Sequence, residues 1–114
     1  QGHPVVNPDS IRLALHGHRF IAQAEPFVWA IAHTMVHSLF LAGHETVILD
    51  ATNTTRKRRD TWKSTEWQTF FKVIDTHVNV CLSRAQDDPE IRPIIEQMSL
   101  HYEPLSEDEI HANL

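Results

Sequence analysis

The sequence predicts an α/β fold in which helices cover a mainly parallel β-sheet. Residues 46–49 form a short apolar run that is rich in β-branched side chains and follows a turn signal at Gly43. A run of this length that is closed by polar residues is typical of a strand buried on both faces. Strand-like segments also alternate with helical segments along the 114 residues. This alternation is the pattern of parallel sheets whose strands are joined through helices.

The chain opens with a short strand and a short helix. Residues 4–7 form an extended segment, and Asn7 and Asp9 are both candidates for the N-cap of the helix that follows. We expect this helix to end near Gly17, because glycine readily adopts the left-handed backbone conformation that closes many helices.

The clearest helical pattern covers residues 24–42. Two adjacent rows of apolar residues recur every four positions and make a wide apolar face that is suited to lying against a sheet. The rows are Phe27, Ile31, Met35 and Leu39, and Val28, Ala32, Val36 and Phe40. Gly43 follows at the position where a left-handed residue would end the helix.

The second half of the chain continues the alternation. In chain order, the expected elements are a helix over 56–64, a strand over 69–74, and helices over 77–84 and 91–102. Thr54 and Thr55 are N-cap candidates for the first of these helices, and the strand would end at Asp75. Residues 109–114 fit a terminal strand or a helix equally well.

Length, charge and cysteine content narrow the class of protein. A chain of 114 residues has room for one domain with one modest core, so residues 1–114 are expected to form a single domain. The net charge of −5 argues against a broadly basic nucleic-acid surface. The longest apolar stretch is broken by polar residues such as His33 and His37, so no membrane span is expected. The single cysteine, Cys81, excludes an internal disulfide and favours a reducing, cytoplasmic compartment.

Three polar residues follow the apolar run at 46–49, namely Asp50, Thr52 and Asn53. In open α/β sheets, ligands bind just beyond the carboxyl ends of the strands, so a carboxylate, a hydroxyl and an amide placed there make a candidate site. The same residue types also form turns that cap a following helix. The pattern alone leaves both interpretations open.

Three segments, in order along the chain, carry a resemblance to a known family. Residues 5–12 read VVNPDSIR, residues 47–53 read VILDATN with Arg58, Arg59 and Trp62 beyond them, and residues 81–104 contain CLSRA, PIIEQM and YEP. They resemble the N-x-D-x-x-R segment, the V-I-x-D-A-T-N segment and the lid of the polynucleotide-kinase-like and zeta-toxin-like P-loop kinases. The resemblance runs over nearly the whole chain.

The resemblance implies transfer of the γ-phosphoryl group of a nucleotide to a hydroxyl acceptor, which is a polynucleotide 5′ end or a small molecule. Asp9 would be the general base for the hydroxyl proton, Arg12 would neutralise an acceptor phosphate, and Asp50 would orient a magnesium-bound water. Other implied contacts are those of Thr52, Asn53 and Arg56 with the acceptor, and of Arg84 and Arg92 with the donor phosphates. ATP and Mg²⁺ are therefore the implied cofactors. Such residues suit phosphoryl transfer, which depends on positioning and on positive charge around the phosphoryl oxygens.

The family also has a three-layer parallel sheet that starts with a strand and a phosphate-binding loop, which this chain does not contain. A G-x-x-x-x-G-K loop needs two glycines five residues apart. Gly2, Gly17 and Gly43 are separated by 15 and 26 residues, so the loop is absent from the chain. The resemblance therefore implies a P-loop kinase-like sheet without its first strand and without its phosphate loop, which in the family lie immediately upstream of the first matching segment.

The lid, at about residues 84–93, departs from the family as well. Relatives usually carry a second arginine about four residues after the first, and Asp88 stands there in this chain. A carboxylate would repel the donor phosphates, so either Arg92 substitutes for the missing arginine or the lid is weakened.

Without the loop, we expect the chain to be inactive as a kinase by itself. The alternative is a non-catalytic kinase fold that acts as a binding or self-associating module. Bare strand edges around residues 46–49 and 69–74 would favour a homo-oligomer, or pairing with a missing upstream segment. A metal site at His33 and His37, one helical turn apart, is a third and weaker hypothesis, because no further ligand lies in register with the pair.

Overall fold

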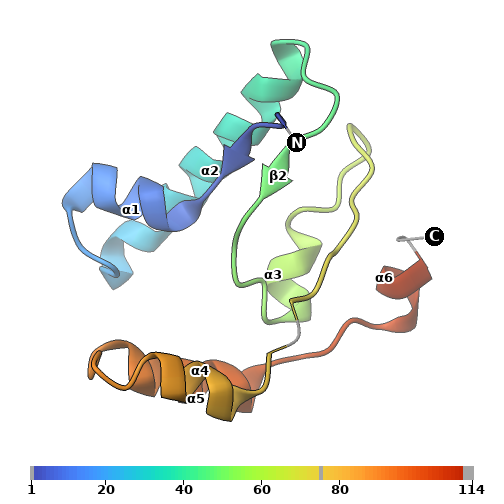
Figure 1. Cartoon of the computed structure of the whole chain (residues 1–114). Coiled ribbons are helices and arrows are strands. Elements are labelled where there is room, and N and C mark those ends of the chain that lie inside the picture. Colours follow the sequence, from blue (N-terminus) through green and yellow to red (C-terminus); the bar gives the residue numbers. More distant parts are fainter. Residues whose placement is uncertain (1, 75, 112–114) are drawn as a thin grey trace. The chain divides into compact units, whose positions relative to one another are not determined.

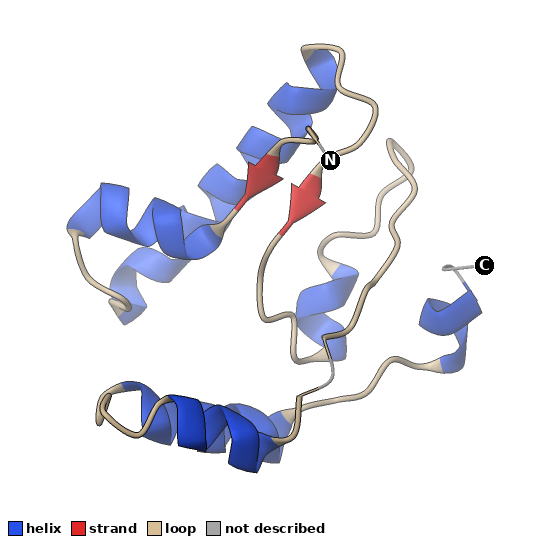
Figure 2. Ribbon diagram, viewed as in Figure 1, coloured by secondary structure: helices blue, strands red, loops and turns tan. Residues whose placement is uncertain are grey.

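The computed structural model describes residues 2–74 and 76–111 (Figure 1). The chain divides into two compact units, Gln1–Thr52 and Asn53–Leu114. About half of the described residues are helical, and their only sheet has two short strands, both in the first unit (Figure 2).

In the first unit, β1 (Val5–Val6) pairs in parallel with β2 (Ile48–Leu49). Val5 lies opposite Ile48 and Val6 lies opposite Leu49. The backbone amide of Ile48 donates to the carbonyl oxygen of Pro4, and that of Asp50 donates to Val6, both at 2.9 Å. This register carries the chain after β1 and the chain after β2 out of the sheet at the same end.

Helix α1 (Pro8–His16) begins directly after β1. Asn7, one of the two predicted caps, is the N-cap, because its side-chain oxygen accepts from the backbone amides of Asp9 and Ser10 at 2.8 and 3.2 Å. Gly17 ends the helix in the left-handed conformation with φ of 76°, as the sequence predicted.

A short 3₁₀ turn, η1 (Ala22–Ala24), leads into helix α2 (Glu25–Leu41), which packs against α1 and β1. Three residues of one predicted apolar row of α2, Val28, Ala32 and Val36, are buried together with Val6 and Ile11 in the core of this unit, and the fourth, Phe40, is half-buried. Most of the adjacent row is exposed, with Phe27 at 64% of its full accessible area. Gly43, with φ of 101°, terminates the helix where the sequence predicted.

The second unit contains four helices among its described residues. They are α3 (Arg56–Asp60), α4 (Val78–Arg84), α5 (Ile91–His101) and α6 (Glu107–His111). Thr55 is the N-cap of α3, and its hydroxyl accepts from the backbone amide of Arg58 at 3.2 Å. Helices α4 and α5 pack against each other, and their ribbons lie together in Figure 1. No helix in the described part of the chain is long and apolar enough to cross a membrane.

The predicted three-layer parallel sheet of the P-loop kinase type is wrong. The described residues form only two paired strands of two residues each, and Ile48 in β2 is 43% exposed rather than buried on both faces. Residues 69–74 form no strand, and Phe70 and Ile74 are exposed; Asp75 lies outside the described residues. An apolar run extends as a strand only where a neighbouring backbone pairs with it, and among the described residues the run at 69–74 belongs to no sheet.

The helices of the second half agree with the sequence more closely than the strands do. The predicted helices over 77–84 and 91–102 correspond to α4 and α5. The tail, which fitted a strand or a helix, is helical from Glu107 to His111, and residues 112–114 lie outside the description.

Candidate acceptor site in the first unit

Three charged residues of the first unit form one connected group. The guanidinium of Arg12 donates from Nε to Glu25 Oε2 at 2.9 Å and from Nη2 to Glu25 Oε1 at 2.7 Å. Its Nη1 donates to Asp9 Oδ1 at 2.8 Å. Asp9 and Arg12 lie three residues apart on α1, and Glu25 is the first residue of α2, so the two packed helices bring the group together.

The group is buried at one end and open at the other. The side chains of Arg12 and Glu25 are only 14% and 17% exposed, whereas that of Asp9 is 80% exposed. The hydrogen bonds from Arg12 to Glu25, followed by those to Asp9, raise the pKa of Arg12 even though burial opposes its charge. The Trp29 ring also lies near this guanidinium, 5.8 Å from Arg12 Cζ to the ring centroid. Arg12 is thus a fixed cation behind an accessible carboxylate.

Asp50 is joined to this group through the cap of α1. Asn7 Nδ2 donates to Asp50 Oδ2 at 3.4 Å, a long hydrogen bond, while its Oδ1 holds the backbone amide of Asp9. Asp9, Arg12 and Asp50 are therefore linked through Asn7 in one polar network beyond the paired strands. Thr52 belongs to the same unit and is exposed.

Asn53 opens the second unit in an unusual conformation. Its φ of 40° places a residue other than glycine in the left-handed region, and its side-chain oxygen is buried without a hydrogen-bond donor among the described residues. Its backbone carbonyl accepts from Arg59 Nη1 at 3.1 Å. Asparagine is one of the residues that adopt this conformation most often, and the acceptor contact predicted for Asn53 stays a prediction.

Arg56, predicted to contact the acceptor, is occupied by side chains of the second unit. It forms two hydrogen bonds with Asp108 at 3.0 and 2.7 Å and one with Asp60 at 2.9 Å, and it also donates to the hydroxyl of Ser106. The hydrogen bonds with Asp108 and Asp60 raise the pKa of Arg56. An acceptor would have to displace at least one of these carboxylates to reach the guanidinium.

The two lid arginines differ in their surroundings. Arg84 is exposed near the end of α4, where a flexible side chain can reach a ligand. Arg92 Nη1 donates to the carbonyl oxygen of Leu82 at 2.6 Å, so it links α5 to α4. Asp88, at the position of the missing lid arginine, accepts from the backbone amide of Ile91 at 3.2 Å and supports the start of α5.

Of the implied cofactors, ATP lacks the phosphate-binding loop that it needs in this chain, whereas Mg²⁺ has one suitable carboxylate. Mg²⁺ is usually held by one or two carboxylates together with phosphate oxygens and water, and Asp50 is the one carboxylate at the end of β2. The described residues contain no group of three histidine, cysteine or acidic side chains that could hold a metal ion. His33 and His37 therefore have no third ligand among the described residues with which to form such a group. The glycines of the chain cannot form a phosphate-binding loop.

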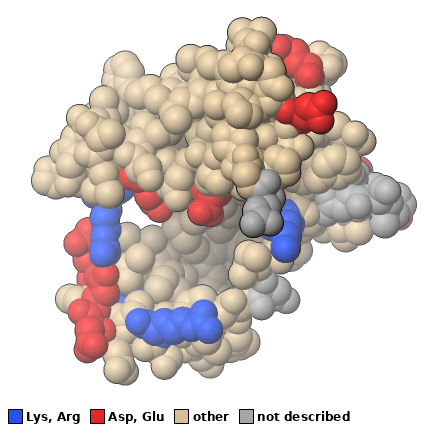
Figure 3. All heavy atoms as spheres, turned by 45° about the horizontal axis from the view of Figure 1, so that its top comes forward, with Lys and Arg blue, Asp and Glu red and all other residues tan. Residues whose placement is uncertain are grey.

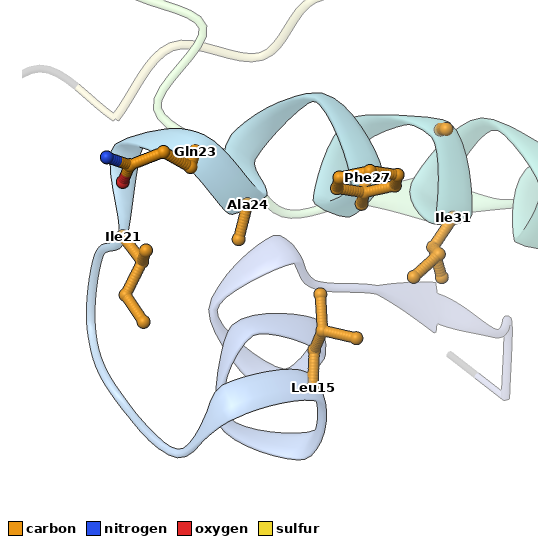
Figure 4. Close-up of a pocket in the computed structure, with 7 residues that line it drawn as sticks. Leu15, Ile21, Gln23, Ala24, Phe27 and Ile31 are labelled. Atoms are coloured by element: carbon orange, nitrogen blue, oxygen red, sulfur yellow. The ribbon is translucent and has the colours of Figure 1, made fainter.

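On the face drawn in Figure 3, acidic and basic side chains are both present and uncharged residues cover most of the area. The first unit also has an open apolar hollow of about 480 Å³. Its lining includes Leu15 of α1, Ile21 before η1, and Phe27 and Ile31 of α2 (Figure 4).

Comparison with known protein families, with curated proteins and with solved structures found no match for this chain.

Two residues of the site were missed in the sequence. Glu25 lies 13 residues after Arg12, and no spacing rule connects positions at that distance in different helices. Asn7 was considered only as a cap, although the motif that contains Asp9 and Arg12 begins with it. Glu25 is itself an acidic residue in the first turn of the strongest predicted helix, and this position was the one available signal for it.

Proposed function

We propose that the first unit forms the acceptor side of a phosphoryl-transfer site, in which Asp9 accepts the proton of a hydroxyl group. The observation that carries this proposal is the exposed carboxylate of Asp9, which is held from behind by Arg12 and Glu25. The resemblance of residues 5–12 and 47–53 to polynucleotide-kinase-like and zeta-toxin-like kinases favours the same role.

The surroundings of Asp9 suit a general base. Its backbone amide is fixed by Asn7 and one carboxylate oxygen by Arg12, so the other oxygen has a defined direction toward solvent. A general base acts when it lies within hydrogen-bond reach of the proton that it removes.

The proposal concerns the acceptor and not the donor. Because no phosphate-binding loop is present in these 114 residues, no step is assigned to a nucleotide or to a metal. The chemistry assigned to the chain is binding of a hydroxyl compound and removal of its proton.

Titration of the ¹⁵N-labelled chain with hydroxyl compounds tests the proposal. The ligands are thymidine and a 5′-hydroxyl pentathymidylate, with the 5′-phosphorylated pentathymidylate as the comparison. We expect the 5′-hydroxyl ligands to shift the amide signals of residues 7–12 and 50–52. The variant Asp9→Asn should weaken binding about tenfold, as expected for loss of a charge-assisted hydrogen bond. Ser10→Ala, on the same exposed turn, is the matched control.

Two results would contradict the proposal. One is an equal affinity for the 5′-hydroxyl and 5′-phosphorylated forms. The other is an affinity for the hydroxyl ligands that Asp9→Asn leaves unchanged. A response to pentathymidylate but not to thymidine would assign the acceptor to polynucleotide ends, and the opposite response would assign it to small hydroxyl compounds.

A second candidate function is self-association, which the apolar hollow beside α2 favours. Phe27 and Ile31 are exposed in this hollow, and burial of such side chains stabilises an interface. A homodimer would cover the hollow with the same surface of a second copy. Sedimentation equilibrium at micromolar concentration decides between a monomer and a homodimer. A monomer with intact α1 and α2 signals would exclude this function and leave the acceptor proposal untouched.

A further inference from the structure

Glu25 has a distinctive place in the site, because it occupies one whole edge of the Arg12 guanidinium. Its two carboxylate oxygens accept from Nε and from Nη2, which is the paired geometry that fixes both the position and the plane of an arginine. A guanidinium has five N–H groups, and these two bonds together with the bond to Asp9 use three of them.

This geometry determines what Arg12 can still do. An arginine binds a phosphate most strongly through a pair of parallel N–H bonds, and the edge formed by Nε and Nη2 is taken by Glu25. Arg12 also faces two carboxylates, from Asp9 and Glu25, so its charge is more than balanced. An anion therefore competes with a carboxylate that is already seated and largely buried.

We propose that Glu25 is the positioning residue of the acceptor site: it directs Nη1 of Arg12 to Asp9 and keeps the Nε–Nη2 edge of the guanidinium from binding anions. The inference rests on the proposed function for the role of Asp9 as general base. The contact between Glu25 and Arg12 can be tested without an acceptor. It assigns Arg12 to orienting the carboxylate of Asp9, in place of the phosphate contact that the family resemblance implied.

Side-chain NMR of the full chain with inorganic phosphate as the probe tests this assignment. The variants are Glu25→Ala and Glu25→Gln, which preserves the volume of the side chain. Glu45→Ala, in the same unit, removes one exposed negative charge away from α1 and serves as the control. The observed signal is the Nε–H group of Arg12, which exchanges slowly with water when it is held in a hydrogen bond.

In the wild-type protein and in Glu45→Ala, we expect a protected Nε–H signal that phosphate does not shift. In both Glu25 variants, the signal should exchange faster and phosphate should bind about tenfold more tightly, because the paired edge becomes available. A merely structural role of Glu25 would change stability without creating this phosphate site.

The inference is overturned if either Glu25 variant keeps its backbone spectrum and shows a protected Nε–H signal with wild-type phosphate affinity. A different result would contradict the proposed function alone. In that case the Arg12 Nε–H signal responds to the Glu25 substitutions as expected, while Asp9→Asn leaves the binding of hydroxyl ligands unchanged.

Discussion

Arg59 of α3 and Glu109 of α6 form a buried ion pair across 50 residues of sequence. Arg59 Nε donates to Glu109 Oε2 at 2.9 Å and Nη2 donates to Oε1 at 3.2 Å, with side chains 2% and 0% exposed. Glu109 also accepts from the backbone amide of Ser106 at 3.1 Å, which is one of the two hydrogen bonds of a capping box at the start of α6. The pair therefore fastens the end of the second unit to α3.

Glu109→Gln is expected to destabilise the second unit by about 3–5 kcal/mol, because it leaves the buried Arg59 without its counter-charge. The measurement is urea denaturation followed by the NMR signals of residues 53–111. Glu96→Gln, at an exposed position of α5, is the control for loss of one negative charge. A Glu109→Gln midpoint equal to that of Glu96→Gln would show that the pair contributes nothing to stability.

Acid should weaken the same contact in a defined pH range. Burial favours the neutral form of Glu109, but hydrogen bonds from Arg59, from Ser106 and from Lys63 outweigh it and lower the pKa of Glu109 to about 2, against an ordinary value of 4.5. Between these two values the unfolded chain binds a proton that the folded chain does not. The contribution is therefore complete above about pH 4.5, where it is on the order of 3 kcal/mol, and is lost as the pH falls toward 2.

Urea denaturation at a series of pH values from 6 to 2 measures this loss. The unfolding free energy of the second unit should fall with pH more steeply in the wild-type protein than in Glu109→Gln, which has no carboxyl group to titrate at that position. Parallel curves for the two proteins would contradict the assignment of the low pKa to Glu109.

The cap of α1 gives a prediction for the first unit. Asn7→Ala removes the acceptor for the backbone amides of Asp9 and Ser10 and should cost about 1 kcal/mol. Asn7→Ser keeps a side-chain oxygen at the cap and should recover most of the loss. Hydrogen exchange of the α1 amides measures both effects. Equal protection in all three proteins would mean that packing on α2 alone holds the helix.

Binding of Mg-ATP tests the absence of a donor site. Without the backbone cradle and lysine of a phosphate-binding loop, the chain should bind Mg-ATP weakly or not at all. Calorimetric titration should show no saturation below the millimolar range. Clear micromolar binding would show that other residues of this chain hold the nucleotide phosphates.

The local parts of the site could be read from the sequence. Asp9 and Arg12 are one helical turn apart, so a helix that starts after Asn7 brings them together whatever surrounds it. The contacts of Glu25 with Arg12 and of Glu109 with Arg59 could not be read in this way. They depend on how separate helices pack, and no periodicity links positions 13 or 50 residues apart.

The sequence by itself determined where α1 and α3 begin and where α1 and α2 end, because the caps Asn7 and Thr55 and the left-handed Gly17 and Gly43 act within a few residues. It did not determine the end of α3, which was expected near residue 64 and lies at Asp60. It could not determine the sheet. The apolar runs at 46–49 and 69–74 looked alike, yet only the first contains a strand, since a strand exists only where another backbone accepts its hydrogen bonds. The tertiary structure also decided which charges pair, because helix packing placed Glu25 on the partly buried Arg12 and Glu109 on the buried Arg59.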